Sequence, residues 1–107
     1  MKKINLLKEI ESLSLKSRTL ENRSLSLIHN PQIIPYEMDC IIEKSIRIIN
    51  KLDGKLSPEI EHVKSLLNQK NSPLHYIRAN PTKEGIAGAG RFGQKLAGLF
   101  INHIESK

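Results

Sequence analysis

Hydrophobic positions recur at three- and four-residue steps along most of the chain, which is the spacing of one face of an α-helix. The clearest such stripe consists of Met38, Ile41, Ile42, Ser45, Ile48, Ile49 and Leu52. Pro35 precedes it and Asp53-Gly54 follow it. Proline is favoured in the first turn of a helix and glycine just beyond the last, so this pattern predicts a helix from about residue 35 to 52.

A first helix is predicted over about residues 3–28 by a longer and looser stripe. Its apolar members are Leu6, Ile10, Leu13, Leu20 and Leu27, and the remaining positions on the same face are Ser17 and Ser24. Small polar residues on a buried face allow a neighbouring helix to pack closely. Asn30-Pro31 end the helix, because the residue before a proline is disfavoured in the helical conformation.

Two further helices are predicted from residues that are typical of helix N-termini. Ser57 and Pro58 supply an N-cap and a first-turn proline for a third helix that ends near Asn71. A short turn at residues 74–78 separates it from a fourth helix that begins at about residue 82. No segment alternates polar and apolar residues for long enough to form a strand. We therefore predict an all-α fold, an antiparallel bundle of three or four helices forming one domain over residues 1–107.

Residues 85–107 form a Gly-rich C-terminal segment whose part from 85 to 100 contains five of the six glycines and both phenylalanines. Five interior glycines cost a helix roughly 4 to 5 kcal/mol relative to alanine, so only close packing makes a helix here stable. One interpretation is a helix that packs closely through Ala89, Gly93 and Ala97. Another is an adaptable tail that becomes ordered on a partner through the contact set Arg91, Phe92, Lys95, Leu99 and Phe100. A dinucleotide loop is disfavoured, because no strand precedes Gly88–Gly93.

The net charge of +6 is concentrated in the C-terminal part. Residues 1–61 contain ten Lys/Arg against nine Asp/Glu, whereas residues 62–107 contain seven against two. A C-terminal part with this excess of positive charge suits binding to an acidic protein, an anionic lipid or a nucleic acid. No apolar run approaches the roughly 20 residues of a membrane span, and the apolar region of a signal peptide is lacking, so we expect a cytoplasmic protein.

Candidate chemistry is sparse. Cys40 is the lone cysteine, and the histidines have no metal-ligand spacing with it, so neither a metal nor a cofactor is predicted. The spacing of Arg23 and His29 resembles the catalytic pair of the helical HEPN ribonucleases, which is one alternative. A basic regulator that binds nucleic acid is another, with Tyr76 and Arg78 beside Arg91 and Phe92 to stack on bases and neutralise phosphates.

Three segments resemble the small bacteriocin immunity proteins of Gram-positive bacteria. These are the start at Met1–Lys3, the helix ending at Ile49–Gly54, and Phe92–Gly98, which is similar to the Ile-Gly-Gln-Lys-Ala-Gly type of ending in that family. The resemblance implies a cytosolic four-helix bundle that binds a bacteriocin-occupied membrane receptor from the cytoplasmic side and recognises it through the C-terminal part. We therefore expect a protein-binding module with no enzymatic activity.

Overall fold

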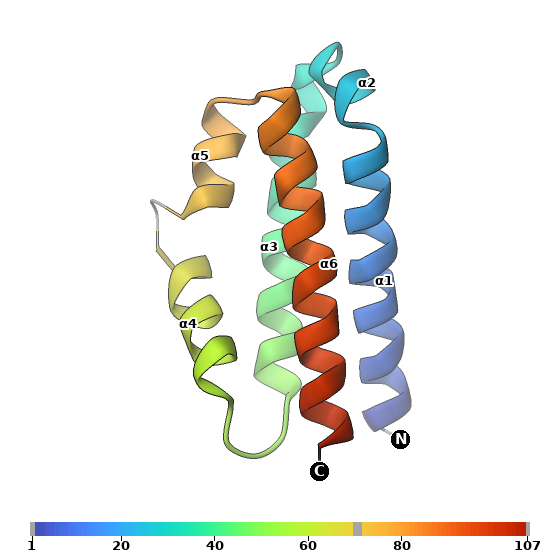
Figure 1. The fold of residues 1–107 in the computed structure, drawn as a ribbon, viewed down its shortest axis with the longest axis vertical. Helices are drawn as coiled ribbons and strands as arrows, with labels where there is room; N and C mark the ends of the chain where they lie inside the picture. The colour runs from blue at the N-terminus through green and yellow to red at the C-terminus, as the bar shows by residue number, and fades with distance from the viewer. Residues whose placement is uncertain (1, 70–71, 107) are drawn as a thin grey trace.

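The computed structural model describes residues 2–69 and 72–106, and the structure there consists of helices without strands. The helices are α1 (Lys2–Asn22), α2 (Ser24–Ile28), the 3-10 helix η1 (Pro31–Ile33), α3 (Ile34–Lys51), α4 (Pro58–Leu67), α5 (Pro73–Ala79) and α6 (Lys83–Glu105). Three long helices, α1, α3 and α6, run side by side, and the short α4 and α5 follow one another along a fourth column (Figure 1). Successive columns run in opposite directions, which confirms the predicted all-α bundle.

Aliphatic side chains from all four columns form the core. Ile10, Ile41, Ile60 and Leu96 are at most 1% exposed, and Phe100 of α6 is completely buried among them. The stripe predicted for α3 is buried from Met38 to Ile49, Ser45 included. The periodicity of the sequence therefore identifies the inner faces of the long helices correctly.

Side-chain caps fix the starts of the last three helices. Ser57 Oγ accepts a hydrogen bond from the Ile60 backbone N–H, and Ser72 Oγ accepts one from the N–H of His75. Thr82 Oγ1 does the same for Gly85 at 2.9 Å. The expected turn at residues 74–78 is instead the helix α5, because Ser72 and Pro73 provide the same cap and first-turn proline as Ser57 and Pro58.

The first predicted helix is interrupted. At Arg23 the backbone leaves the helical conformation (φ −106°, ψ 18°), which separates α2 from α1. The break occurs at Asn22-Arg23-Ser24, where Asn and Ser have low helix propensity. The helix after Pro35 also differs at its end: α3 stops at Lys51, and Gly54 adopts its positive φ of 82° in the following loop.

The backbones of α1 and α6 approach one another closely at two glycines. A Cβ atom on Gly90 would lie 2.5 Å from the Ser17 carbonyl oxygen and 2.7 Å from the Glu21 nitrogen. A Cβ atom on Gly93 would lie 2.7 Å from Ser17 Cβ and closer still to Ser17 Oγ. Real Cβ atoms do not occupy such positions, so this contact requires glycine on α6 and a small residue on α1. The predicted close packing through Gly93, with Ala89 and Ala97 buried on either side, therefore takes place within the chain.

We expect Gly90→Ala to destabilise the protein by about 1 to 3 kcal/mol, because the added methyl group overlaps backbone atoms that cannot move without separating the helices. Gly98→Ala is the matched control, since a Cβ there meets nothing within 4 Å. That substitution should stabilise the helix by up to about 1 kcal/mol. Urea unfolding followed by circular dichroism measures both. Equal effects of the two substitutions would contradict the close contact.

Ser17→Ala should stabilise the protein by roughly 1 kcal/mol, because the Ser17 hydroxyl is completely buried without a hydrogen-bond partner. Ser45 is a matched control: it is equally buried, but its Oγ donates to the Ile41 carbonyl oxygen at 2.7 Å. Ser45→Ala should therefore be neutral or destabilising in the same unfolding experiment. A loss of stability in Ser17→Ala as large as in Ser45→Ala would show that the Ser17 hydroxyl is satisfied.

Candidate functional site

The residues of the expected contact set are distributed around α6. Arg91 and Lys95 are exposed, and Phe92 and Leu99 are half-buried. Phe100 was expected to anchor a partner, but this is wrong for the folded chain, because its side chain is fully enclosed by the core. The same packing argues against the adaptable tail: α6 is a continuous helix that lies along α1 of its own chain (Figure 1).

Arg91 lies next to α1. Its Nη1 is 3.4 Å from Glu21 Oε2, and Gln94 Nε2 donates to Glu21 Oε1 at 2.8 Å. The Arg91 side chain remains 62% exposed, so the ion pair contributes little to stability. Lys95, one turn further along α6, forms no ion pair with a described carboxylate. Lys95 is therefore the cation of the contact set that is available to a partner.

An apolar crevice of about 170 Å³ opens where α4, α5 and α6 meet. Its walls are Leu66, Leu67, Ser72, Pro73, Leu74, Ile77, Gly88, Ala89 and Phe92. Two features of the sequence create it. The fourth column is split between α4 and α5, and Gly88 of α6 has no side chain to fill the space, since a Cβ there would meet only Arg91 Nη2 at 3.8 Å. A cavity of this size accepts a benzene-sized group.

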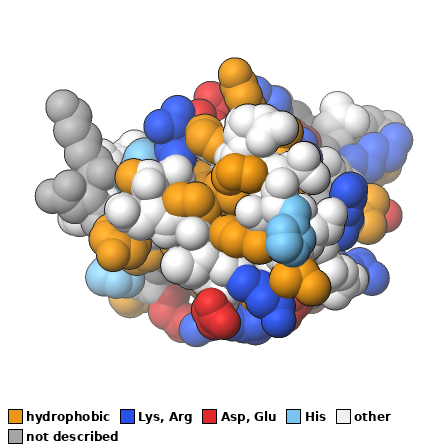
Figure 2. Space-filling view, turned by 90° about the horizontal axis from the view of Figure 1, so that it is seen from above, with side chains coloured by type: hydrophobic (Ala, Val, Ile, Leu, Met, Phe, Trp, Pro, Cys, Tyr) orange, Lys and Arg blue, Asp and Glu red, His pale blue; other side chains and the backbone are white. Residues whose placement is uncertain are grey.

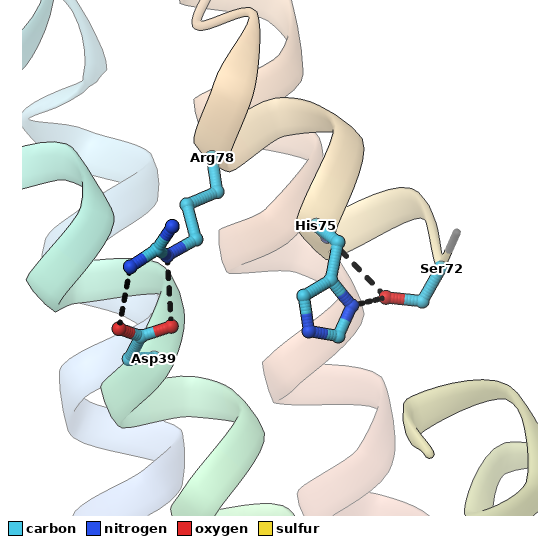
Figure 3. A network of polar contacts seen from close by, with 4 residues as sticks. All are labelled: Asp39, Ser72, His75 and Arg78. Carbon is cyan, nitrogen blue, oxygen red and sulfur yellow. Dashed lines mark hydrogen bonds and ion pairs between the residues drawn. The ribbon is translucent and has the colours of Figure 1, made fainter. Parts of the chain in front are cut away.

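Two sets of polar contacts involve α5, which forms one wall of the crevice (Figure 3). Arg78 Nε and Nη2 donate to the two carboxylate oxygens of Asp39 on α3, at 3.0 and 3.2 Å. At the start of α5, Ser72 Oγ lies 2.5 Å from His75 Nδ1 and also accepts the His75 backbone N–H. The Arg78–Asp39 ion pair therefore ties the end of α5 to α3, and the Ser72–His75 contacts fix the start of the helix.

The Ser72–His75 pair is a helix cap. Ser72 is 1% exposed, and no described carboxylate forms a hydrogen bond with the imidazole. A nucleophilic serine needs access to a substrate and a base that is oriented by a third group. These two residues lack both features, although Ser72 is part of the crevice wall. They serve to start α5.

The other candidate residues lie elsewhere. Arg23 and His29 are exposed at the two ends of α2, and neither side chain forms a hydrogen bond or ion pair with a described residue. The ribonuclease alternative therefore stays a hypothesis. So does nucleic-acid binding, although Arg78 and Arg91, two of the cations named for it, are engaged by Asp39 and Glu21.

Among the described residues, no three His, Cys, Asp or Glu side chains lie close enough together to hold a metal ion. His103 is buried, and its Nε2 donates to the Asp53 carbonyl oxygen at 2.8 Å, which ties α6 to the loop after α3. Cys40 is a half-buried free thiol. None of the described helices is long and apolar enough to span a bilayer.

A second apolar surface lies at the end of the bundle formed by α2 and η1. Seen from this end, hydrophobic side chains gather near the middle and charged side chains of both signs lie around the rim (Figure 2). Leu25 of α2 is 56% exposed and Ile33 of η1 is 40% exposed.

Sequence reasoning identified Phe92 but missed Leu66, Leu74 and Ile77 as its partners in the crevice. The signal available in the sequence was the repeated Ser-Pro start at residues 57–58 and 72–73, which divides one column of the bundle into two short helices. A divided column covers its neighbour incompletely. Comparison of the chain with protein-family models, curated proteins and solved structures finds no match.

Proposed function

We propose that this protein is a non-enzymatic helical module that binds another protein, and that the α4–α5–α6 crevice receives an apolar side chain of that partner. The crevice itself carries the proposal. It is open to solvent and lined almost entirely by apolar groups, and its α5 wall is tied to α3 by the Arg78–Asp39 ion pair. Preformed apolar pockets of this kind typically receive the anchor residues that dominate the binding energy of an interface.

Charge indicates the kind of partner. The half-buried Phe92 and Leu99 lie on the same side of α6 as the exposed Lys95. Residues 62–107 have seven cations against two carboxylates, and two of these cations, Arg78 and Arg91, are paired with Asp39 and Glu21. An acidic protein segment with one bulky apolar residue complements this surface, with the apolar residue in the crevice and carboxylates near Lys95. Such charge complementarity mainly raises the association rate and disfavours basic partners.

The resemblance to bacteriocin immunity proteins makes this proposal more specific. On that basis the partner is a membrane receptor occupied by a bacteriocin, and the protein approaches it from the cytoplasm. The features that support it are the helical bundle and the Phe92–Gly98 segment, whose Phe92 borders the crevice.

Benzene provides a direct probe of the crevice. Titration followed by ¹H–¹⁵N NMR should give saturable shifts at Leu74, Gly88 and Phe92, because these residues line the crevice. Gly88→Leu should abolish the binding, because Gly88 lines the crevice and a larger side chain at this position has room to extend into it. Gly98→Leu is the matched control on an open surface and should leave the binding unchanged. Shifts that do not saturate, or that survive Gly88→Leu, would contradict a preformed anchor site.

Protection of a sensitive strain tests the immunity proposal. Expression of the protein in a bacteriocin-sensitive Gram-positive strain should raise survival in the presence of one member of a panel of peptide bacteriocins. Gly88→Leu should lower that protection at least about tenfold, equivalent to a loss of about 1.4 kcal/mol of binding energy, whereas Gly98→Leu should retain it. Survival that stays at the level of the empty vector across the panel would reject an immunity function. The benzene titration tests the binding site independently of that outcome.

A further inference from the structure

A second cleft, of about 180 Å³, lies between α1 and α3. Its lining residues are Lys8, Glu9, Ser12, Lys44, Arg47 and Ile48. It shares no residue with the α4–α5–α6 crevice. The two clefts also differ in chemistry: the crevice is apolar, whereas half of the residues that line this one are cations.

The cations of this cleft lack counter-ions. Lys44 Nζ donates to the hydroxyl of Ser12 at 3.2 Å, and neither Lys8 nor Arg47 forms an ion pair with a described carboxylate. Glu9 is the acidic residue of the lining, and its Oε2 is engaged by Lys51 Nζ at 2.8 Å. The cleft therefore has an excess of positive charge that its own residues do not neutralise.

No described carboxylate of the neighbouring surface forms an ion pair with Lys8, Lys44 or Arg47. Asp39 and Glu43 lie in the next hollow along α3, which Lys44 and Arg47 also border. Asp39 accepts both hydrogen bonds of Arg78, and Glu43 is exposed and forms no ion pair with a described cation. On the α1 side, Lys16 is paired with Glu37 at 2.9 Å. Along this groove, Glu9, Glu37 and Asp39 are paired with cations outside the cleft, and Glu43 is an unpaired carboxylate beside it.

Helix spacing explains why the cluster converges. Lys8 and Ser12 are four residues apart on α1, and Lys44 and Arg47 are three residues apart on α3, so each pair occupies one helix face. The floor between the helices includes Ile48, which is 1% exposed. An apolar floor lowers the local dielectric constant and strengthens attraction to an anion that enters the cleft.

The geometry points to a binding site for a phosphate group in this cleft, from either a soluble phosphorylated compound or a lipid headgroup. A phosphate dianion matches the cluster better than a carboxylate, because it offers more charge and more acceptor oxygens to three cations. Arg47 can donate two hydrogen bonds to a phosphate, and Lys8 and Lys44 act as point charges. The Ser12 hydroxyl, which now accepts from Lys44, is free to donate its own proton to the anion.

Inorganic phosphate is the first probe. Titration at constant ionic strength, with sodium chloride replaced by sodium phosphate, should give saturable ¹H–¹⁵N shifts at Ser12, Lys44 and Arg47. The double substitution Lys44→Gln/Arg47→Gln should weaken the binding at least about tenfold. Lys55→Gln/Lys83→Gln is the matched control, since it removes the same charge from exposed positions outside both clefts and should leave the affinity unchanged. Circular dichroism verifies that both variants are folded.

Vesicles distinguish the two sources of the phosphate group. Binding to phosphatidylcholine vesicles that contain phosphatidic acid, lost in Lys44→Gln/Arg47→Gln and competed by free phosphate, assigns the site to a lipid headgroup. Binding of inorganic phosphate without vesicle binding assigns it to a soluble compound. Shifts that fail to saturate, or an equal loss of affinity in both double variants, would overturn the proposal, because diffuse net charge would then explain the interaction. The benzene titration should be unaffected by either variant. A failure of the phosphate site can therefore be distinguished from a failure of the proposed function.

Discussion

The backbone of α6 lies against α1 at Gly90 and Gly93, where Ser17 and Glu21 leave no space for another carbon atom. The five glycines of α6 cost roughly 4 to 5 kcal/mol of intrinsic helix stability. Burial of Ile86, Leu96 and Phe100, each at most 1% exposed, contributes about 1.5 to 3 kcal/mol per side chain. The close approach makes that burial possible, so α6 is stable as a helix only in contact with α1.

The same helix leaves its other side incompletely covered. Gly88 faces the junction of two short helices, α4 and α5, where it leaves room for a guest side chain. Glycine therefore has opposite roles within one helix: at Gly90 and Gly93 it lets two backbones meet, and at Gly88 it keeps a crevice open. Substitution tolerance should differ between these positions for physical reasons that residue type alone does not reveal.

Much of the fold could be predicted from the sequence, because apolar spacing and helix caps are local signals. The α3 stripe, the Ser57 cap and the start of α6 near residue 82 all follow from them. The break at Arg23 and the helix α5 were missed, although both have local signals: residues of low helix propensity at the break, and the Ser72-Pro73 cap at the start of α5. For the candidate site, Phe92 and Lys95 were chosen from residue type. Phe100 was misassigned because an aromatic residue has the same local signature in a core as on a surface.

The contact between α1 and α6 also has a consequence for biosynthesis. Gln94 and Glu21, which are hydrogen-bonded in the folded protein, are 73 residues apart along the chain. Closing so long a loop costs conformational entropy before any contact forms, and such distant contacts slow folding. A nascent chain that has not yet released α6 from the ribosome leaves the apolar face of α1 without its main neighbour. Until then the face is exposed to chaperones and to other nascent chains, so the release of α6 controls when its contact with α1 can protect the chain from aggregation.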